Sequence, residues 1–457
     1  MGDDTLIEED RYELDKATVA AIVEAAEAGA ADRLAELMQP LHAADIADLL
    51  EQVDDEPRAA ILRLFEPEFD GEILSEIDDS IRDQVIETLS PETLSEAVRE
   101  LDSDDVVDIL EDLEAPQQEV ILEALEDEDR AIVEQALAYP EVSAGRLMQR
   151  EIVAGPAHWT VGEAIDYLRA REDLPEDFYH MILVDPRYRP VGYVTLGKIL
   201  GHPRDQKLAE ITEDSFRTIE AMEDEAEVAY AFNQYHLISA PVVDENGRLV
   251  GVITIDDAMA VLDEEAEEDI LRLAGVGEES SLADKVIATT RRRFPWLAVN
   301  LVTAVLASLV IAIYEDAIAQ IVALAVLMPI VASMGGNAGT QSLTVAVRAI
   351  ATKDLTGANV WRVIRREVLV GLVNGVLFAV VMGIVGMIWF GSAVLGGVIA
   401  AAMVINLVVA GLAGTVIPVA LVRLRIDPAL ASGAFVTTVT DVVGFFAFLG
   451  LAAAILL

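Results

Sequence analysis

The chain has no cysteine, and only 5 of its 457 residues are histidines. Disulfide bonds, thiolate metal sites and cysteine nucleophiles are therefore excluded. The histidines do not form a zinc-binding HExxH spacing, and the sequence has neither a GxxxxGKS/T phosphate loop nor a serine nucleophile elbow. These absences argue against an enzyme.

Positive charge is scarce as well. The chain carries 31 Lys and Arg against 80 Asp and Glu, which gives a formal net charge of −49. Only 6 of those acids, but 10 of the basic residues, lie after residue 289. The sequence therefore joins an acidic half to a slightly basic half, and its acidic balance argues against nucleic acid as a partner.

The basic half is strongly apolar. Five stretches long enough to cross about 30 Å of hydrocarbon lie near residues 296–313, 318–347, 368–389, 393–422 and 429–456. Basic clusters precede the first stretch and separate the second from the third and the fourth from the fifth. The positive-inside rule makes that side cytoplasmic. We therefore predict a multi-pass protein of the inner or plasma membrane, with its N-terminus in the cytoplasm and its C-terminus outside.

The first part of the acidic half has a helical pattern. Short amphipathic segments such as DVVDILEDL place apolar residues three and four positions apart. Ser90-Pro91-Glu92 and Ser103-Asp104-Asp105 put a capping side chain and acids at helix starts, where the helix dipole favours negative charge. We predict an all-α solenoid of stacked helix pairs.

The pattern then changes to alternating strands and helices, and it repeats. Residues of a first α/β module return at one offset in a second: Val184-Asp185, Gly192 and Thr195 recur as Val243-Asp244, Gly251 and Thr254. A long, acidic helix is expected from residue 257 to the first membrane span. The predicted multidomain chain therefore consists of a helical solenoid, two α/β modules, an acidic connecting helix and an all-α membrane pore domain, at residues 1–138, 139–204, 205–262, 263–290 and 291–457.

The two α/β modules resemble a tandem pair of cystathionine-β-synthase (CBS) domains. In many such domains, a strand-to-helix segment like Gly251–Asp257 binds adenine nucleotides, which here would place Thr254 and Asp257 against a ribose of ATP or a related nucleotide. The first module has Lys198 where the second has that acid, so the resemblance implies at most one good nucleotide site. A purely structural CBS pair is the alternative.

One carboxylate lies near the middle of the fifth apolar stretch, at Asp441. An ionisable group at this depth costs several kcal/mol unless it is paired or lines water. Because the surrounding spans contain no Lys, Arg or His to pair with it, a cation from outside is the expected partner. Mg²⁺ keeps its waters and is usually bound through one or two carboxylates, and two copies of Asp441 across a dimer axis would favour divalent ions. The alternative is a protonated structural acid.

The second apolar stretch is interrupted by proline, glycine and amides between Pro329 and Ser342. Such residues predict a helix break, which is tolerated at membrane depth where the backbone lines a water-filled cavity. Asn337 and Gln341 would then line a pore and orient the waters of a hydrated ion. The alternative is close helix packing of the GxxxG kind through Gly335 and Gly339, which does not explain the two amides.

Together these features resemble the MgtE family of magnesium channels. The resemblance rests on the Pro329–Gln341 segment, on Asp427-Pro428-Ala429, on Phe435–Thr438 with Asp441, and on the order of the domains. It implies a homodimer in the lipid bilayer, a central pore lined by the second and fifth spans, and Asp441 as the selectivity acid.

The resemblance also implies a sensor that closes the pore when intracellular Mg²⁺ binds between acidic surfaces. The acids that match the family's ligands are Asp104, Asp108, Asp257, Glu265, Glu268, Asp269 and Asp427. His236 and Ala260 stand where the family commonly has acids. We therefore predict a Mg²⁺-selective uptake channel that internal Mg²⁺ closes. The alternatives are a divalent-cation transporter coupled to H⁺ or Na⁺, and a membrane-anchored nucleotide sensor that transports nothing.

Overall fold

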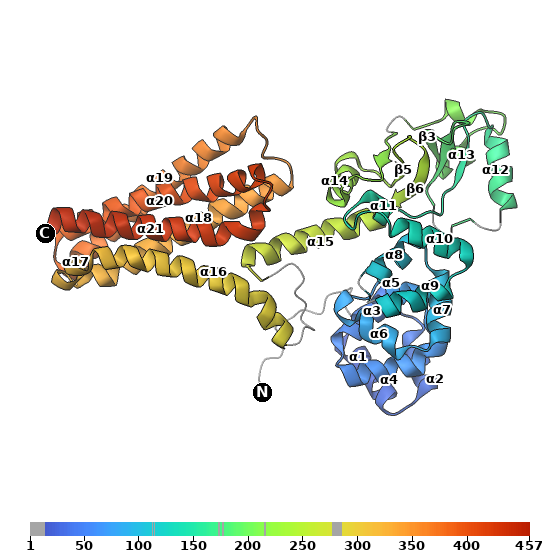
Figure 1. Cartoon of the computed structure of the whole chain (residues 1–457), viewed down its shortest axis with the longest axis horizontal. Coiled ribbons are helices and arrows are strands. Elements are labelled where there is room, and N and C mark those ends of the chain that lie inside the picture. The colour runs from blue at the N-terminus through green and yellow to red at the C-terminus, as the bar shows by residue number, and fades with distance from the viewer. Residues whose placement is uncertain are drawn as a thin grey trace. The chain divides into compact units, whose positions relative to one another are not determined.

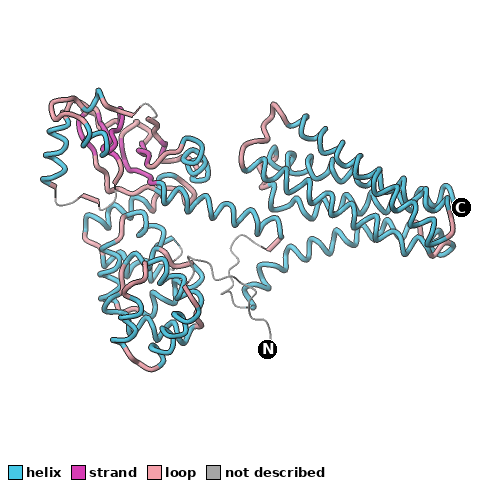
Figure 2. Tube along the Cα trace, turned by 180° about the vertical axis from the view of Figure 1, so that it is seen from behind, coloured by secondary structure: helices cyan, strands magenta, loops and turns pink. Residues whose placement is uncertain are grey.

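The computed structural model describes residues 14–111, 113, 115–171, 174–175, 178–213, 216–276 and 286–457. It divides into two compact units, Met1–Glu265 and Ala266–Leu457 (Figure 1). Figure 2 shows that the strands are confined to one part of the first unit, and that the second unit is helical. The predicted combination of all-α, α/β and membrane-type all-α parts is confirmed.

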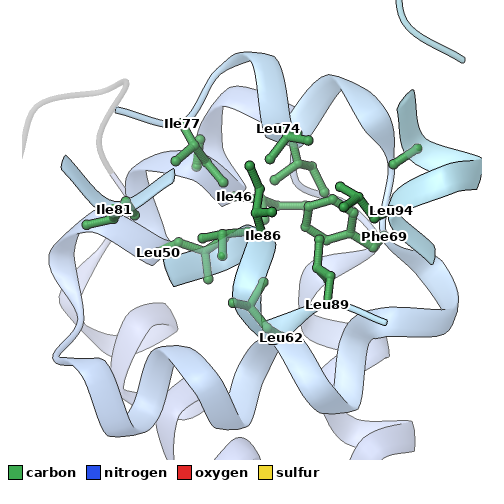
Figure 3. Packing of buried hydrophobic residues seen from close by; sticks show 14 of the residues in the cluster. Ile46, Leu50, Leu62, Phe69, Leu74, Ile77, Ile81, Ile86, Leu89 and Leu94 are labelled. Atoms are coloured by element: carbon green, nitrogen blue, oxygen red, sulfur yellow. The ribbon is translucent and has the colours of Figure 1, made fainter. Parts of the chain in front are cut away.

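The chain begins with a helical domain. Its helices are α1 Lys16–Glu27, α2 Ala31–Met38, α3 Ala43–Gln52, α4 Asp55–Phe65, η1 Glu66–Glu68, α5 Gly71–Ser75, α6 Asp79–Thr88, α7 Pro91–Glu100, α8 Ser103–Glu111, α9 Ala115–Ala124 and α10 Asp127–Ala136. The expected cap at Ser90 is present, since its hydroxyl accepts a hydrogen bond from the Thr93 N–H. Apolar side chains from successive helices, including Leu50 and Leu62, share one core with Phe69 from the connection between η1 and α5 (Figure 3).

Two α/β modules follow, and they have the same topology. Their elements are α11 Ala144–Leu147, β1 Ala154–Pro156, α12 Val161–Ala170, β2 His180–Val184, β3 Pro190–Thr195, α13 Leu196–Gly201, η2 Leu208–Glu210, β4 Ile219–Glu220, α14 Glu225–Tyr235, β5 Ser239–Val243 and β6 Leu249–Thr254. The sheets β1-β2-β3 and β4-β5-β6 each have one parallel and one antiparallel pair.

The repeated Asp and Arg close equivalent turns in the two modules. Asp185 accepts a hydrogen bond from the Arg189 N–H at 2.9 Å, and Asp244 accepts one from the Arg248 N–H at 2.8 Å. Such a side-chain bond stabilises a tight turn between antiparallel strands. The sequence repeat therefore reflects a repeated strand–turn–strand structure.

The acidic connecting helix is shorter than expected. Helix α15 is a single helix, Ile255–Ala274, whose first turn follows β6 directly. It ends at Gly275, which has a φ of +69° and supplies the left-handed conformation that often terminates helices. A helix continuing from residue 263 to residue 290 is therefore wrong, and the part of that prediction at 277–285 lies outside the described residues.

The second unit contains five helices, among its described residues, that are long and apolar enough to cross a membrane. They are α16 Val286–Ile313, α18 Ala323–Ala351, α19 Val360–Phe390, α20 Ala393–Arg423 and α21 Pro428–Leu456, and a short α17 Glu315–Gln320 joins the first two. Helix α20 packs against α18, α19 and α21, while α16 packs on α21. The predicted five spans are confirmed.

The helix break predicted between Pro329 and Ser342 is absent, because α18 continues through Pro329. Gly335 and Gly339 instead allow close packing. A Cβ at Gly335 would collide with the Asn406 side chain, and one at Gly339 would lie 2.6 Å from the Val436 side chain. A proline can be accommodated in a membrane helix when neighbouring helices satisfy the backbone. Small-residue packing therefore explains the glycines, as the alternative interpretation held.

Candidate functional site

Asp441 lies near the midpoint of α21 and is partly exposed. The neighbouring threonine hydroxyls donate their hydrogen bonds within α21 and not to the Asp441 carboxylate. Thr437 donates to the Gly433 carbonyl at 2.9 Å, and Thr438 donates to the Ala434 carbonyl at 2.6 Å. Within the described residues, no Lys, Arg or His forms an ion pair with Asp441. Its carboxylate is therefore available to a ligand that comes from outside the helix bundle.

Asn337 and Gln341 are exposed on one side of α18, since residues four apart share a helix face. The opposite side of α18 is buried in the bundle and contains Gly335 and Gly339. A Cβ at Gly339 would also lie 3.4 Å from the Thr440 side chain, so α18 and α21 approach each other beside Asp441. The three predicted pore residues thus lie on two helices in direct contact.

Two polar residues inside the bundle were missed from the sequence. Asn406 on α20 is fully buried, and its Nδ2 donates to the Val331 carbonyl at 2.8 Å. Glu367 on α19 is 8% exposed and accepts a hydrogen bond from the Ser342 hydroxyl at 2.9 Å. Asn406 stands alone in an apolar run, which was the available signal. Glu367 follows two arginines and lies just before the third apolar stretch predicted at 368–389, so nothing in the sequence pattern placed it inside the bundle.

A carboxylate cluster forms in the first unit, where the first turn of α8 lies close to the first turn of α15. It combines the predicted Asp104 and Asp257 with Asp105, which the sequence had suggested only as part of a cap. Burial raises the pKa of Asp104 well above its ordinary value, and the charge of Asp257 raises it further. Burial, with the charge of Asp257, raises the pKa of Asp105 to about 7. We call these three residues the α8–α15 cluster.

Asp257 is hydrogen-bonded within its own module. Burial raises its pKa to about 6, although hydrogen bonds from Thr254 oppose this rise. The Thr254 hydroxyl donates to the Asp257 carboxylate at 2.6 Å. Asp108 is placed differently, because it is exposed and pairs with Arg82 at 3.1 Å. The predicted sensor residues of α8 therefore separate into a buried acid, Asp104, and an arginine-paired one.

Glu265 contributes to a second acidic group, which surrounds Glu225 at the start of α14. Burial raises the pKa of Glu225 to about 7, and the charges of Glu264, Glu111 and Glu265 raise it further. Glu111 itself pairs with Arg146 at 2.8 Å. Of this group, only Glu265 was predicted from the sequence.

The remaining predicted acids meet at the end of α15. Arg272 lies between two of them, 2.6 Å from Glu268 and 2.9 Å from Asp427. Burial raises the pKa of Asp269, and the charge of Asp427 raises it further, while Arg272 opposes the rise. Leu273 packs beside these charges against side chains of α18 and α21. We call Glu268, Asp269 and Asp427 the α15-end cluster.

The described residues of these clusters do not form a preorganised set of direct metal ligands. Among the described residues, no group of three or more His, Asp or Glu side chains is arranged to hold a metal ion directly. Mg²⁺ usually keeps several waters and is bound through one or two carboxylates, so it does not require such a group.

The predicted nucleotide site borders a small cavity between the two α/β modules. A cavity of about 20 Å³ beside Thr254 is lined by both modules, and it has room for about one water. His180 Nδ1 and the Ser239 hydroxyl meet at 2.5 Å across it. The Asp257 carboxylate is already bonded to Thr254. The cavity is smaller than an adenine nucleotide.

Family comparisons agree with the order of the parts. A model described as MgtE, divalent cation transporter, matches residues 328–451. The MgtE intracellular N domain matches residues 41–142, and a CBS domain matches residues 208–264.

Relatives match most of the chain. The magnesium transporter MgtE of Bacillus subtilis is 34% identical over 334 residues, which cover 73% of this chain and 74% of that protein. The magnesium transporter MgtE of Thermus thermophilus is 34% identical over 331 residues, or 72% and 73% of the two chains. A solved cytosolic domain of the Mg²⁺ channel MgtE in complex with ATP is 30% identical and covers 53% of this chain and 99% of its own, with a TM-score of 0.49.

Proposed function

This chain belongs to the MgtE family of magnesium transporters, and we propose that it is a Mg²⁺-selective uptake channel whose ion path passes Asp441. One observation carries the proposal: a partly exposed carboxylate lies midway along a membrane span, with no ion-pair partner among the described residues. Such a group is costly in hydrocarbon and tolerable beside a hydrated cation. The family's transported ion, Mg²⁺, supplies that charge.

We further propose that the chain works as a homodimer. The exposed sides of α18 and α21 then face their counterparts across a central axis, with Asn337, Gln341 and Asp441 of both copies along the path. Two like charges near one axis favour a divalent over a monovalent ion. The amides orient the waters that Mg²⁺ retains.

Internal Mg²⁺ regulates this channel in the proposed mechanism. The raised pKa values of the α8–α15 cluster reflect burial and mutual repulsion of its carboxylates. A divalent cation offsets that repulsion and therefore favours the compact arrangement in which the carboxylates are close. The α15-end cluster carries the same effect to the start of α21, which leads to Asp441. Inflow stops when the cell is replete.

The continuous spans favour a channel over a coupled transporter. Secondary transporters commonly bind their substrate at broken helices within paired repeats. Here α18, α20 and α21 are each a single helix. ATP binding at Thr254 and Asp257 stays a prediction, and it requires more room than the small cavity beside Thr254 provides.

Mg²⁺ flux into liposomes that contain the purified chain tests the role of Asp441. We expect Asp441→Asn to lower the flux at least tenfold, or to let monovalent ions through, because the amide keeps the shape and removes the charge. Asp316→Asn is the matched control, since that acid is exposed on the short helix α17. Unchanged flux and selectivity in Asp441→Asn would refute the proposed path.

A further inference from the structure

Helix α18 is tied to its neighbours by two buried hydrogen bonds. Its Val331 carbonyl accepts from Asn406 on α20, and its Ser342 hydroxyl donates to Glu367 on α19. The two attachment points are 11 residues apart, which is about three helical turns, so they lie on the same side of α18. Both attachments therefore resist rotation of α18 about its axis.

Asn406 is an unusual residue at this place. It is fully buried, and its Oδ1 has no hydrogen-bond partner within the described chain. A leucine of similar size would fill the same volume without leaving a polar atom unsatisfied in an apolar setting. The amide therefore destabilises the bundle at one atom while it attaches α18 at the other.

The same amide also contacts α21. A Cβ at Gly444 would lie 2.7 Å from Asn406 Nδ2, and a Cβ at Gly335 of α18 would collide with the same group. Gly444 is three residues, or nearly one turn, after Asp441. One side chain of α20 thus fixes the approach of both helices that carry the proposed path.

The attachments determine which side of α18 is free. On a helix that turns about 100° per residue, Ser342 lies roughly 20° around from Val331, while Asn337 and Gln341 lie roughly 240° and 280° around. The first pair faces the bundle, and the second pair is exposed. Rotation by one residue would move an amide off the exposed side.

We propose that Asn406 and Glu367 are positioning residues for ion conduction, which hold α18 in the rotation that presents Asn337 and Gln341 to the path. This inference rests on the proposed function of α18 as a pore helix. Neither residue touches the ion. Each acts through a hydrogen bond to α18.

For Glu367 the proposal requires an acceptor and not a charge. Ser342 is the donor, so the amide oxygen of Glu367→Gln can still accept its hydrogen bond. Glu367→Leu cannot. We expect Gln to retain Mg²⁺ flux close to that of the unmodified chain, and Leu to reduce it about tenfold, which corresponds to about 1.4 kcal/mol. Equal loss in both variants would overturn the positioning role.

Cysteine labelling measures the rotation itself, because the chain has no cysteine of its own. Gln341→Cys, at an exposed position, and Ala346→Cys, at a position that is 1% exposed on the buried side of α18, are made separately in the full chain in liposomes, and each is reacted with a charged, water-soluble thiol reagent. With Asn406 present, position 341 should react much faster than position 346. Adding Asn406→Leu should slow labelling at 341 about tenfold and speed it at 346, a reversal that mere loss of stability does not produce.

Thr415→Val is the control variant. Thr415 is also fully buried on α20, but its hydroxyl donates to Gly411 of its own helix at 2.9 Å, so it does not attach α18. We expect this variant to leave both labelling rates unchanged. Slow labelling of 341 in the otherwise unmodified chain would contradict the pore role of α18. Fast labelling of 341 that persists in both Asn406→Leu and Glu367→Leu would overturn the positioning inference alone.

Discussion

The carboxylates of the α8–α15 cluster combine negative charge with burial. Asp104 is 9% exposed, and the charges that raise its pKa beyond the effect of burial are those of other acids. Ion pairs relieve such crowding elsewhere in this unit, as Arg82 does for Asp108. The cluster therefore depends on protons or cations for its stability.

A pH dependence follows from the raised pKa values of Asp105, about 7, and Asp257, about 6. Both exceed the value of about 4 expected in the unfolded chain, so the folded state holds these protons more tightly. Without Mg²⁺, the free energy of unfolding should fall as pH rises from about 4 to about 7, by on the order of 1.4 kcal/mol for each unit of pKa difference. Thermal melting of the full chain measures this.

Two additions sharpen that measurement. Asp105→Asn should flatten the pH dependence, because the amide does not titrate. Mg²⁺ should raise the melting temperature more at pH 8 than at pH 5, since at pH 5 the cluster is protonated. A melting temperature that rises steadily from pH 4 to 7 without Mg²⁺ would show that ionisation of the α8–α15 cluster does not destabilise the folded chain.

Among the elements, α19 and α20 pack closely through glycine. A Cβ at Gly396 would lie 2.5 Å from the Gly383 carbonyl oxygen, whereas a Cβ at the adjacent Gly397 would have nothing within 4 Å. Gly396→Ala should therefore destabilise the protein by about 1–3 kcal/mol through overpacking. Gly397→Ala should be neutral or stabilise it by up to about 1 kcal/mol, because alanine favours the helix. Thermal unfolding in detergent compares the pair, and equal melting temperatures would contradict the packing.

The sensor prediction belongs to helix α15, which carries acids of two clusters. Neutralising Asp257, Glu268 and Asp269 together should leave the channel open at high internal Mg²⁺, because Mg²⁺ then lacks the carboxylates through which it stabilises the compact arrangement. The measurement is flux from liposomes loaded with graded Mg²⁺.

A matched neutralisation of exposed acids provides the control. Asp263→Asn, Glu267→Gln and Glu245→Gln remove the same number of charges from exposed positions, two of them on α15. The control should close normally. If the sensor variant also closes normally, the two clusters do not bind the regulatory Mg²⁺.

The spans and the two modules were predictable because each follows from a strong, local pattern. Hydrocarbon demands long apolar helices, and the Asp185 and Asp244 turns repeat with their strands. The continuity of α18 was missed, because Pro329 and the glycines predict a break unless one knows that α20 packs closely against them. The end of α15 could have been predicted from Gly275, because a glycine often terminates a helix, but this signal was overlooked.

The clusters were less predictable. An acidic residue in a chain with 80 of them says little by itself, and burial distinguishes Asp104 from Asp108 only after α8 and α15 come together. Arg272 was missed because its two partners, Glu268 and Asp427, are far apart in the sequence.

At the scale of the whole molecule, charge and hydropathy divide the chain into an acidic part, which we propose senses Mg²⁺, and an apolar part, which we propose conducts it. We propose the domain boundaries 1–138, 139–204, 205–262 and 291–457, with segment 263–290 beginning near the middle of α15. We also propose a cytoplasmic N-terminus and an outside C-terminus, from the basic residues at the span ends. The molecule then exposes its acidic surfaces to the Mg²⁺ that it regulates.

The most direct test of this account is the electrical current through the purified chain in a planar bilayer, with equal pH and equal Na⁺ on both sides and Mg²⁺ as the permeant ion. The account predicts a Mg²⁺ current that falls as Mg²⁺ on the side of the cytoplasmic unit is raised. A Mg²⁺ current that requires a gradient of H⁺ or Na⁺, or that ignores cytoplasmic Mg²⁺, would contradict it.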